Sequence, residues 1–330
     1  MHILYSGIAV LVLGAMGYLG GSVPGLRVIF GAFIPYSAFL IFLCGVTYRV
    51  VRWARSPVPF RIPTTCGQQK SLPWIRSGWL ESPSGISGTL GRMGLEVLLF
   101  RSLFRNNRME LHPDRKLSYA GELLLGVASL AFHWSLLIIV LRHLRFYFEP
   151  VPGFVTLIET LDGWFQVSLP PIYLTDAVLL TALSYLLVRR LKDAPLRYIS
   201  LFTDYFALFL LLGLSLSGVY LRYFDRLDLL EVKQLALGLV HFTPDLSPGL
   251  RPSFFVHLFL ICVLVGYFPF SKLIHMGGVF LSPTRNLPNN SRMKRHVNPW
   301  HRPAKVHTYE EWETEFRDKI LACGMPLDRE

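Results

Sequence analysis

The chain has 330 residues, 52% of them hydrophobic, a mean hydropathy of +0.40 and a formal net charge of +11. This composition is typical of a single membrane-embedded body and argues against two ordinary water-soluble domains, although the length alone would accommodate them. The four cysteines are far apart and form no CxxC pair, so the sequence offers no cysteine-based iron–sulfur or zinc motif.

Six apolar runs approach or exceed the roughly 20 residues that a membrane-spanning helix needs. We expect these helices at residues 3–21, 28–50, 120–147, 171–190, 199–222 and 254–276. The first run has almost no basic residue ahead of it and lacks an A-x-A-type cleavage site, so we predict a retained helix rather than a signal peptide. The predicted fold class is therefore an all-α integral membrane protein with about six transmembrane helices.

The basic residues predict the orientation of these helices. Segments 49–116, 189–197 and 272–330 hold 12, 4 and 10 of the 33 Lys and Arg residues, and the segments on the opposite side hold the other 7. Cytoplasmic loops carry the excess of Lys and Arg, so we predict that these three segments and both termini are cytoplasmic. The positive charge is then mainly a signal of topology, which removes most of the case for a nucleic-acid partner.

The long cytoplasmic insertion 51–117 divides into two parts. Residues 56–85 are rich in Pro, Gly and Ser and are expected to lack regular structure. Residues 88–106 place leucines beside arginines, which predicts an amphipathic helix on the inner membrane surface. Cys66 lies in the first part, without a second cysteine or an activating base nearby. Its thiol is either a contact or redox group for a partner or, more simply, inert.

Further short helices are expected outside the spans. Residues 150–170 and 226–242 are moderately apolar and are predicted to cap the outer end of the bundle. The tail after Pro283 is polar. There, Thr308 and Glu311 form a capping-box pattern that begins a soluble helix extending to about residue 322.

Four histidines lie within two of the apolar runs: His133 and His143 in the third, His257 and His275 in the sixth. An ionisable residue in a membrane helix is costly and usually functional. The third run is predicted to point outward and the sixth inward, so His143 pairs with His257 near the outer face and His133 with His275 near the inner face. Two histidines on each of two helices can hold two hemes by bis-imidazole ligation.

The spacing of these histidines along their helices is unequal. On ideal helices, the ten residues from His133 to His143 span about 15 Å and the eighteen from His257 to His275 about 27 Å. Helix tilt and tilted heme planes would have to absorb the difference of about 12 Å. The alternative is four independent hydrogen bonds between helices, which gives no reason for the depths to match.

Charged residues near the histidines suggest supporting roles. Arg142 and Arg145 are candidates to bind the propionates of the outer heme or simply reach the outer interface, and Lys272 stands in the same relation to the inner heme. Asp162 and Asp176 lie near the outer face, where a quinol would release protons; each is either a proton acceptor or a helix cap. Arg142, Asp162 and Asp176 are therefore the quinone-site candidates.

The histidine spacing resembles that of the gamma subunits of respiratory nitrate reductases, diheme cytochromes b that oxidise quinol, over about residues 28–280. The surrounding sequence resembles the DsrM family, the membrane cytochromes b of the DsrMKJOP complexes of sulfur-metabolising prokaryotes. The stretches that carry this likeness include SPVPFRIPTTCGQQKSLPWI, AFHWSLLIIVLRHLRFYFEPVP, VHLFLICVLVGYFPFSKLIHMGGVFLSPTRNLPNNSR and KVHTYEEWE.

The resemblance implies a nitrate reductase gamma-like bundle formed by the second to sixth spans, with two heme b groups on the four histidines and menaquinone or menaquinol as substrate. It implies a location in the prokaryotic cytoplasmic membrane and electron exchange with the cytoplasmic iron–sulfur subunit DsrK, which connects to DsrC. DsrJ, DsrO and DsrP are the other implied partners. Residues 1–27 would form an extra N-terminal helix, 28–280 the diheme domain, and 281–330 a tail that docks partners.

Under this interpretation the chain is an electron-transfer subunit of an oxidoreductase complex and not a stand-alone enzyme. A second hypothesis is a heme-free membrane anchor for soluble redox subunits, which the cytoplasmic segment and tail fit equally well. A third is a proton or anion transporter with a histidine relay. Against the third, the two histidine-bearing runs are read as lacking the mid-helix Gly/Pro breaks expected of transporter sites.

Overall fold

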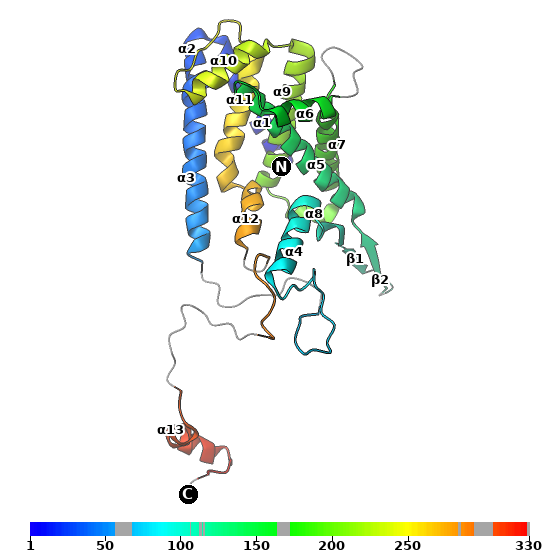
Figure 1. Ribbon diagram of the computed structural model, residues 1–330, viewed down its shortest axis with the longest axis vertical. Coiled ribbons are helices and arrows are strands. Elements are labelled where there is room, and N and C mark those ends of the chain that lie inside the picture. Colours follow the sequence, from blue (N-terminus) through cyan, green and yellow to red (C-terminus); the bar gives the residue numbers. More distant parts are fainter. Residues whose placement is uncertain are drawn as a thin grey trace.

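Long helices dominate the computed structural model and form a bundle that extends along the vertical axis of Figure 1. The structure describes residues 1–56, 68–105, 107–111, 114, 116–163, 172–282, 285–293 and 306–328.

Five helical stretches of the described chain are long and apolar enough to span a membrane. They are α1 (His2–Ser22), α2–η1–α3 (Pro24–Val28, Ile29–Phe33, Ile34–Ala54), α5–η3 (Leu123–His143, Leu144–Phe146), α9–η4 (Phe202–Val219, Tyr220–Asp225) and α11–η5 (Pro252–Tyr267, Phe268–Phe270). Five of the six predicted spans are thereby confirmed, and the chain has the architecture of a multi-pass membrane protein.

The remaining predicted span, 171–190, forms α7 (Leu174–Lys192), which is not among those five because charges lie near both of its ends. The helix nevertheless belongs to the bundle, where it packs against α5 and α9 (Figure 1). Buried apolar residues join the three helices: Phe132, Leu179, Ala182, Leu183 and Leu211.

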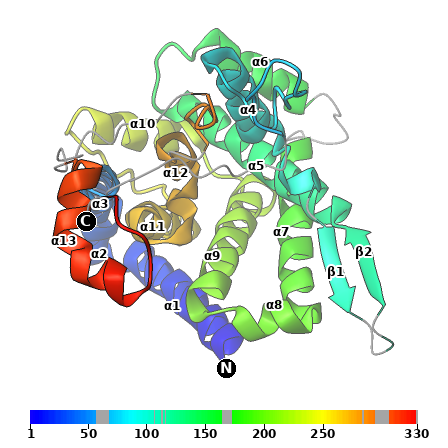
Figure 2. The same ribbon diagram turned by 90° about the horizontal axis from the view of Figure 1, so that it is seen from below.

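The N-terminal helix α1 is an integral part of the bundle. It packs against α9 and α11, and Figure 2 shows α11 with α1, α3 and α9 around it. Glycines allow the backbones of α1 and α11 to approach closely: a Cβ atom on Gly17 or Gly21 would lie 2.8 Å from the Cα of Val256 or Pro252. The hydroxyl of Ser6 donates a hydrogen bond to the carbonyl of Phe202 at 3.0 Å.

The sixth predicted span is confirmed as a membrane-length helix to residue 270, but its expected continuation to residue 276 as one helix was wrong. After α11 and η5 the chain turns at Ser271, forms η6 (Lys272–Ile274) and begins a separate helix α12 (His275–Leu281). Pro269 lies at this break. Proline interrupts a helix because it lacks an N–H donor and its ring clashes with the preceding turn. Because this span is broken, the absence of helix breaks cannot be used here as an argument against a transporter. The predicted separation of about 27 Å between His257 and His275, which assumed one ideal helix, does not apply either.

The segment between α3 and α5 contains α4 (Ile86–Leu99), η2 (Leu103–Arg105) and a hairpin of two antiparallel strands, β1 (Asn107–Leu111) and β2 (Leu117–Gly121). The predicted helix 88–106 is thus real but ends at residue 99, and the hairpin was not predicted. Residues 68–85 form turns and loops, as expected. Cys66 lies outside the described residues.

The one arginine of helix α4 does not face a surface. Arg92 is only 2% exposed and donates hydrogen bonds to the carbonyl groups of Arg285 and Leu287. The Asn289 N–H binds the carbonyl of Pro83 at 2.6 Å. These contacts fasten α4 and the loop before it to the segment that follows α12.

Short helices complete the fold. As predicted, short helices form in the two segments expected to cap the bundle, α6 (Gly153–Asp162) and α10 (Leu229–Val240), and the tail forms α13 (Tyr309–Ala322) with its Thr308/Glu311 capping box. A further short helix, α8 (Ala194–Ile199), follows α7.

Candidate functional site

The structure brings the four membrane histidines together in the two predicted pairs. The ring centroids of His143 and His257 are 6.4 Å apart, with their planes at 23°, and those of His133 and His275 are 6.0 Å apart, with their planes at 88°. We call these the outer pair and the inner pair, after the predicted topology. Because His275 begins α12, beyond the break at 268–274, it can face His133 although the spacing along the two helices is unequal.

One nitrogen of each of these rings is already engaged. Nδ1 lies 2.7–2.8 Å from an oxygen of the protein: Ser129 O for His133, Ile139 O for His143, Ser217 Oγ for His257 and Lys272 O for His275. A carbonyl only accepts hydrogen bonds, so in the three rings that face one, Nδ1 carries the proton and Nε2 keeps its lone pair. This is the arrangement in which a histidine binds a metal through Nε2.

The distance within each pair fits one metal ion between two rings. An imidazole nitrogen lies about 1.1 Å from its ring centroid and binds a transition metal at about 2.0–2.1 Å, so two rings on opposite sides of one ion have centroids about 6.3 Å apart. The measured 6.4 and 6.0 Å match this value. Both pairs therefore fit bis-imidazole ligation of a heme iron, and their function as ligands stays a prediction.

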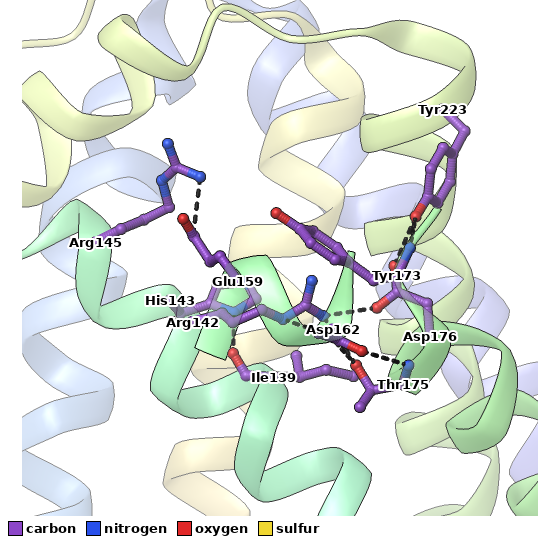
Figure 3. Close-up of polar contacts among 10 residues, drawn as sticks. All are labelled: Ile139, Arg142, His143, Arg145, Glu159, Asp162, Tyr173, Thr175, Asp176 and Tyr223. Atoms are coloured by element: carbon purple, nitrogen blue, oxygen red, sulfur yellow. Dashed lines mark hydrogen bonds and ion pairs between the residues drawn. The ribbon is translucent and has the colours of Figure 1, made fainter. Parts of the chain in front are cut away.

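The outer pair adjoins a buried charged network (Figure 3). The Arg142 side chain is 8% exposed; its Nη2 lies 2.9 Å from Asp176 Oδ1 and its Nε lies 3.2 Å from Asp162 Oδ2. Asp162 also accepts the N–H and O–H of Thr175, at 2.9 and 2.6 Å, and so caps the start of α7. The three quinone-site candidates thus form one cluster, in which the guanidinium of Arg142 is engaged by two carboxylates.

Aromatic residues complete this network. The Cζ atoms of Arg142 and Arg222 lie over the ring of Tyr173, 3.6 and 3.9 Å from its centroid. Two planar cations so close to one centroid must occupy opposite faces of the ring, in a cation–π sandwich. The hydroxyl of Tyr223 donates to Asp176 at 3.0 Å and accepts from the N–H of Tyr173 at 3.1 Å. No spacing pattern in the sequence indicated the tyrosines or Arg222.

The other two candidate cations are engaged away from the histidine rings. Arg145 binds Glu159 on α6 at 2.9 Å (Figure 3). Lys272 binds Asp204, at the start of α9, at 2.7 Å, although its side chain is 77% exposed. The carbonyl of Lys272, in contrast, contacts Nδ1 of His275. Lys272 thus touches the inner pair through its backbone.

Two residues of α9 hold the outer ring of His257, and sequence reasoning missed both. The hydroxyl of Ser217 lies 2.8 Å from its Nδ1. At Gly218, an added Cβ would lie 3.1 Å from its Cε1, so a larger residue would press on the ring. Serine and glycine are ordinary packing residues in membrane helices, which is why the sequence alone did not distinguish them.

The inner pair adjoins aromatic rings and the segment 68–105. His133 contacts both Phe100 and Phe132, whose ring centroids are 4.8 and 4.7 Å from its own, each in an edge-to-face arrangement. The indole N–H of Trp134 donates to the carbonyl of Leu98 at 3.0 Å and ties α5 to α4.

Below Phe100, an acidic residue holds the end of this segment. Glu81 binds both Arg101 and Arg105. The hydrogen bond from Arg101, opposed by partial burial and aided by both positive charges, holds the pKa of Glu81 below its usual value.

The fold and these pairs define a class: a multi-pass helical membrane protein with two sites suited to bis-histidine ligation of a metal. A family model described as nitrate reductase gamma subunit matches residues 95–292, and the chain belongs to this family.

Two curated relatives are similar over most of the chain, both described as an Hdr-like menaquinol oxidoreductase cytochrome b-like subunit. The one from Archaeoglobus fulgidus is 45% identical over 286 residues, which cover 84% of this chain and 85% of the relative. The one from Archaeoglobus profundus is 43% identical over 274 residues, covering 81% of each chain.

Proposed function

We propose that the chain is the diheme membrane cytochrome b subunit of a menaquinol-linked electron-transfer complex. His143 and His257 hold the outer heme b, and His133 and His275 the inner one. The observation that carries the proposal is the facing of the histidines in two pairs at the separation of bis-imidazole ligation, with Nδ1 engaged in every ring. The names of the Archaeoglobus relatives, which include both menaquinol and cytochrome b, support it.

When bound, the two hemes would carry single electrons across the membrane between a quinone and a cytoplasmic iron–sulfur partner. The chain's own contribution is to orient the ligands. Backbone carbonyls hold Nδ1 of three rings and Ser217 contacts that of the fourth, which fixes the ring orientations and leaves Nε2 as the nitrogen to bind iron. The surrounding apolar helices exclude water and lower the local dielectric, which strengthens the electrostatic effect of nearby charges.

At the outer level, the cluster of Arg142, Asp162 and Asp176 is the candidate for proton handling and quinone contact. Its groups form a continuous set of hydrogen bonds and ion pairs from Asp162 through Arg142 and Asp176 to Tyr223. A carboxylate so placed can accept a proton from a quinol. Arg145 and Lys272 remain candidates for the heme propionates, each in competition with its carboxylate partner.

Within this family, we assign the chain to the DsrM type, because the stretches of sequence quoted above resemble that type. In that setting the cytoplasmic partner is DsrK, connected to DsrC, and DsrJ, DsrO and DsrP complete the complex in the prokaryotic cytoplasmic membrane. The insertion 51–117 and the tail 281–330 are the docking segments, and both termini are cytoplasmic. The alternative is a heme-free anchor, against which the matched geometry of the histidine pairs argues.

A difference spectrum tests the proposal. We would record dithionite-reduced minus air-oxidised spectra of the native complex and of the purified chain, with pyridine hemochrome quantitation, beside His143→Ala and His275→Ala. His241→Ala is a matched control, because the Nδ1 of His241 also faces a backbone carbonyl four residues earlier, at 2.8 Å, but this residue is exposed just after the end of α10 and is not one of the paired histidines.

Two b hemes in the parent chain are expected, with a different one lost or shifted in each of the two pair variants and neither affected in His241→Ala. Full and unperturbed heme content in both pair variants would refute the ligand assignment. A native complex without heme assignable to this chain would leave the anchor hypothesis as the better one.

A further inference from the structure

The two histidine pairs differ in the angle between their ring planes. The outer rings are close to parallel, at 23°, whereas the inner rings are crossed, at 88°. An imidazole donates π-electrons mainly to the metal d orbital that lies perpendicular to its ring plane. Parallel rings therefore donate to one orbital and separate it in energy from its partner, whereas crossed rings donate to both and leave them nearly equal. Ligand geometry of this kind is one means by which a protein tunes a heme.

The side chains around the rings explain how the crossed arrangement is held. His133 has two close aromatic contacts, Phe100 at 85° and Phe132 at 76°, with centroids less than 5 Å from its own. In the outer pair, the described aromatic neighbour of His143, apart from its partner histidine, is Phe146 at 5.9 Å. Crowding by aromatic edges is therefore a feature of the inner pair.

Phe100 reaches His133 through an unusual backbone conformation. It ends α4 in the left-handed region, with φ 50° and ψ 43°, a conformation that glycine adopts more readily than any other residue. Its N–H bonds to the carbonyl of Glu96, and the N–H of Arg101 returns to that of Leu95, which closes the helix. A large aromatic side chain in a strained helix cap indicates that its position is specified by the surroundings.

A second phenylalanine of the same segment, Phe104, packs against α5 without a described contact to a histidine ring. Phe104, in η2, lies against Gly126 of α5, where a Cβ would meet its ring at 2.9 Å. None of its described ring contacts is with a histidine. Phe100 and Phe104 thus both join the cytoplasmic segment to α5, but the ring of Phe100 lies against a predicted heme ligand.

We propose that Phe100 is a positioning residue that holds the imidazole of His133 crossed relative to that of His275, so that the inner and outer iron sites differ in ligand-plane angle. The inference rests on the proposed function, since the planes matter only when iron is bound. Arg92 and Asn289 fasten the segment that carries Phe100 to the segment after α12, so this cytoplasmic unit is mechanically connected to the inner ligand.

Electron paramagnetic resonance of the oxidised, heme-loaded complex tests the proposal without measuring activity. Crossed ligand planes give a low-spin ferric signal with a markedly larger maximum g-value than parallel planes do. We expect two low-spin signals in the parent, one of each kind, and the signal with the larger value to be lost in His275→Ala. In Phe100→Ala its maximum g-value shifts toward that of the outer site, while the outer signal is unchanged.

Controls separate orientation from loss of packing. Phe100→Tyr keeps the aromatic edge and should retain the parent spectrum, as should Phe104→Ala. If Phe100→Ala fails to assemble, Phe100→Leu keeps bulk without the edge and should show the same shift. An unchanged larger g-value in Phe100→Ala or Phe100→Leu with full heme content would overturn the role of Phe100. Two signals with the same maximum g-value in the parent would show that the two pairs do not differ in the angle between their imidazole planes. A complex without heme on this chain would instead refute the proposed function.

Discussion

The outer and inner histidine pairs use the same residue type in different surroundings. Around the outer pair, Arg142, Asp162 and Asp176 form a buried network of charges, and His257 has a serine hydroxyl at its Nδ1. Around the inner pair, aromatic rings crowd His133, and the nearby Lys272 side chain is mostly exposed, although the carboxylate of its partner Asp204 is buried. Both pairs therefore hold their rings through Nδ1 and leave Nε2 for a metal. They differ in their surroundings: buried charges lie beside the outer pair, and packed aromatic side chains lie beside the inner pair.

The largest difference between the two pairs is expected when the neighbouring cation, Arg142 or Lys272, is removed and the stability of the protein is measured. Arg142→Met leaves two largely buried carboxylates without this partner, and breaking a buried pair in this way costs about 3–5 kcal/mol of stability. Lys272→Met removes a cation that is 77% exposed, and its single buried partner, Asp204, keeps the hydrogen bond from the N–H of Leu201, so the expected cost is only about 1 kcal/mol. The measurement is the thermal unfolding midpoint of the detergent-solubilised protein by circular dichroism. Equal shifts in the two variants would show that the Arg142 network is not a buried structural unit.

The second largest effect is expected from the loss of the contact between Ser217 and His257, which should weaken heme binding at the outer pair only. Ser217→Ala removes the hydroxyl that contacts Nδ1, and loss of such a contact to a metal ligand typically lowers metal affinity about 10–100-fold. We expect faster transfer of the outer heme, but not of the inner one, to apomyoglobin. Ser215→Ala is the matched control, because this serine on the same helix binds the carbonyl of Leu211. Equal loss of both hemes would indicate general destabilisation instead.

The smallest expected effect is that of pH on the ion pairs of Glu81, in the segment 68–105 near the inner pair. The pKa of Glu81 is lowered in the folded protein, chiefly by the hydrogen bond from Arg101. Its ion pairs therefore stabilise residues 68–105 at neutral pH, and this contribution is lost as the pH falls below the usual carboxyl value of 4.5 through the lower folded value. Both arginines are partly exposed, so the expected loss is only a few-fold in hydrogen-exchange protection.

Glu81→Gln should show the reduced protection already at neutral pH and little further change on acidification. A parent protein whose protection, corrected for intrinsic exchange rates, is the same at pH 7 and pH 3.5 would contradict this prediction.

Periodicity and charge predicted much of the fold because apolar length and the distribution of Lys and Arg act over whole helices. They gave five confirmed spans, the capping helices and α13. The depth pairing of the histidines followed from helix direction alone. The break at Pro269 was missed because the apolar run continues through it, and hydropathy does not register a lost N–H donor.

Tertiary contacts account for the rest of what the sequence did not show. Arg142 and the two aspartates were singled out separately, but their union depends on how α5, α6 and α7 pack. Phe100 lies within the predicted helix 88–106, but its left-handed cap and its contact with His133 arise from the docking of α4. The hairpin at 107–121 lies where the predicted helix and span left a short gap, which carried no clear strand pattern.

The break between α11 and α12 has a consequence for how the chain can vary in length. On α5, one extra residue between His133 and His143 would turn one ring by about 100° relative to the other. Residues 268–274 are not a continuous helix, so an insertion there need not rotate His275 in this way. Homologous chains should accordingly keep the interval of ten residues on α5 unchanged and concentrate insertions and deletions between the other two histidines at this joint.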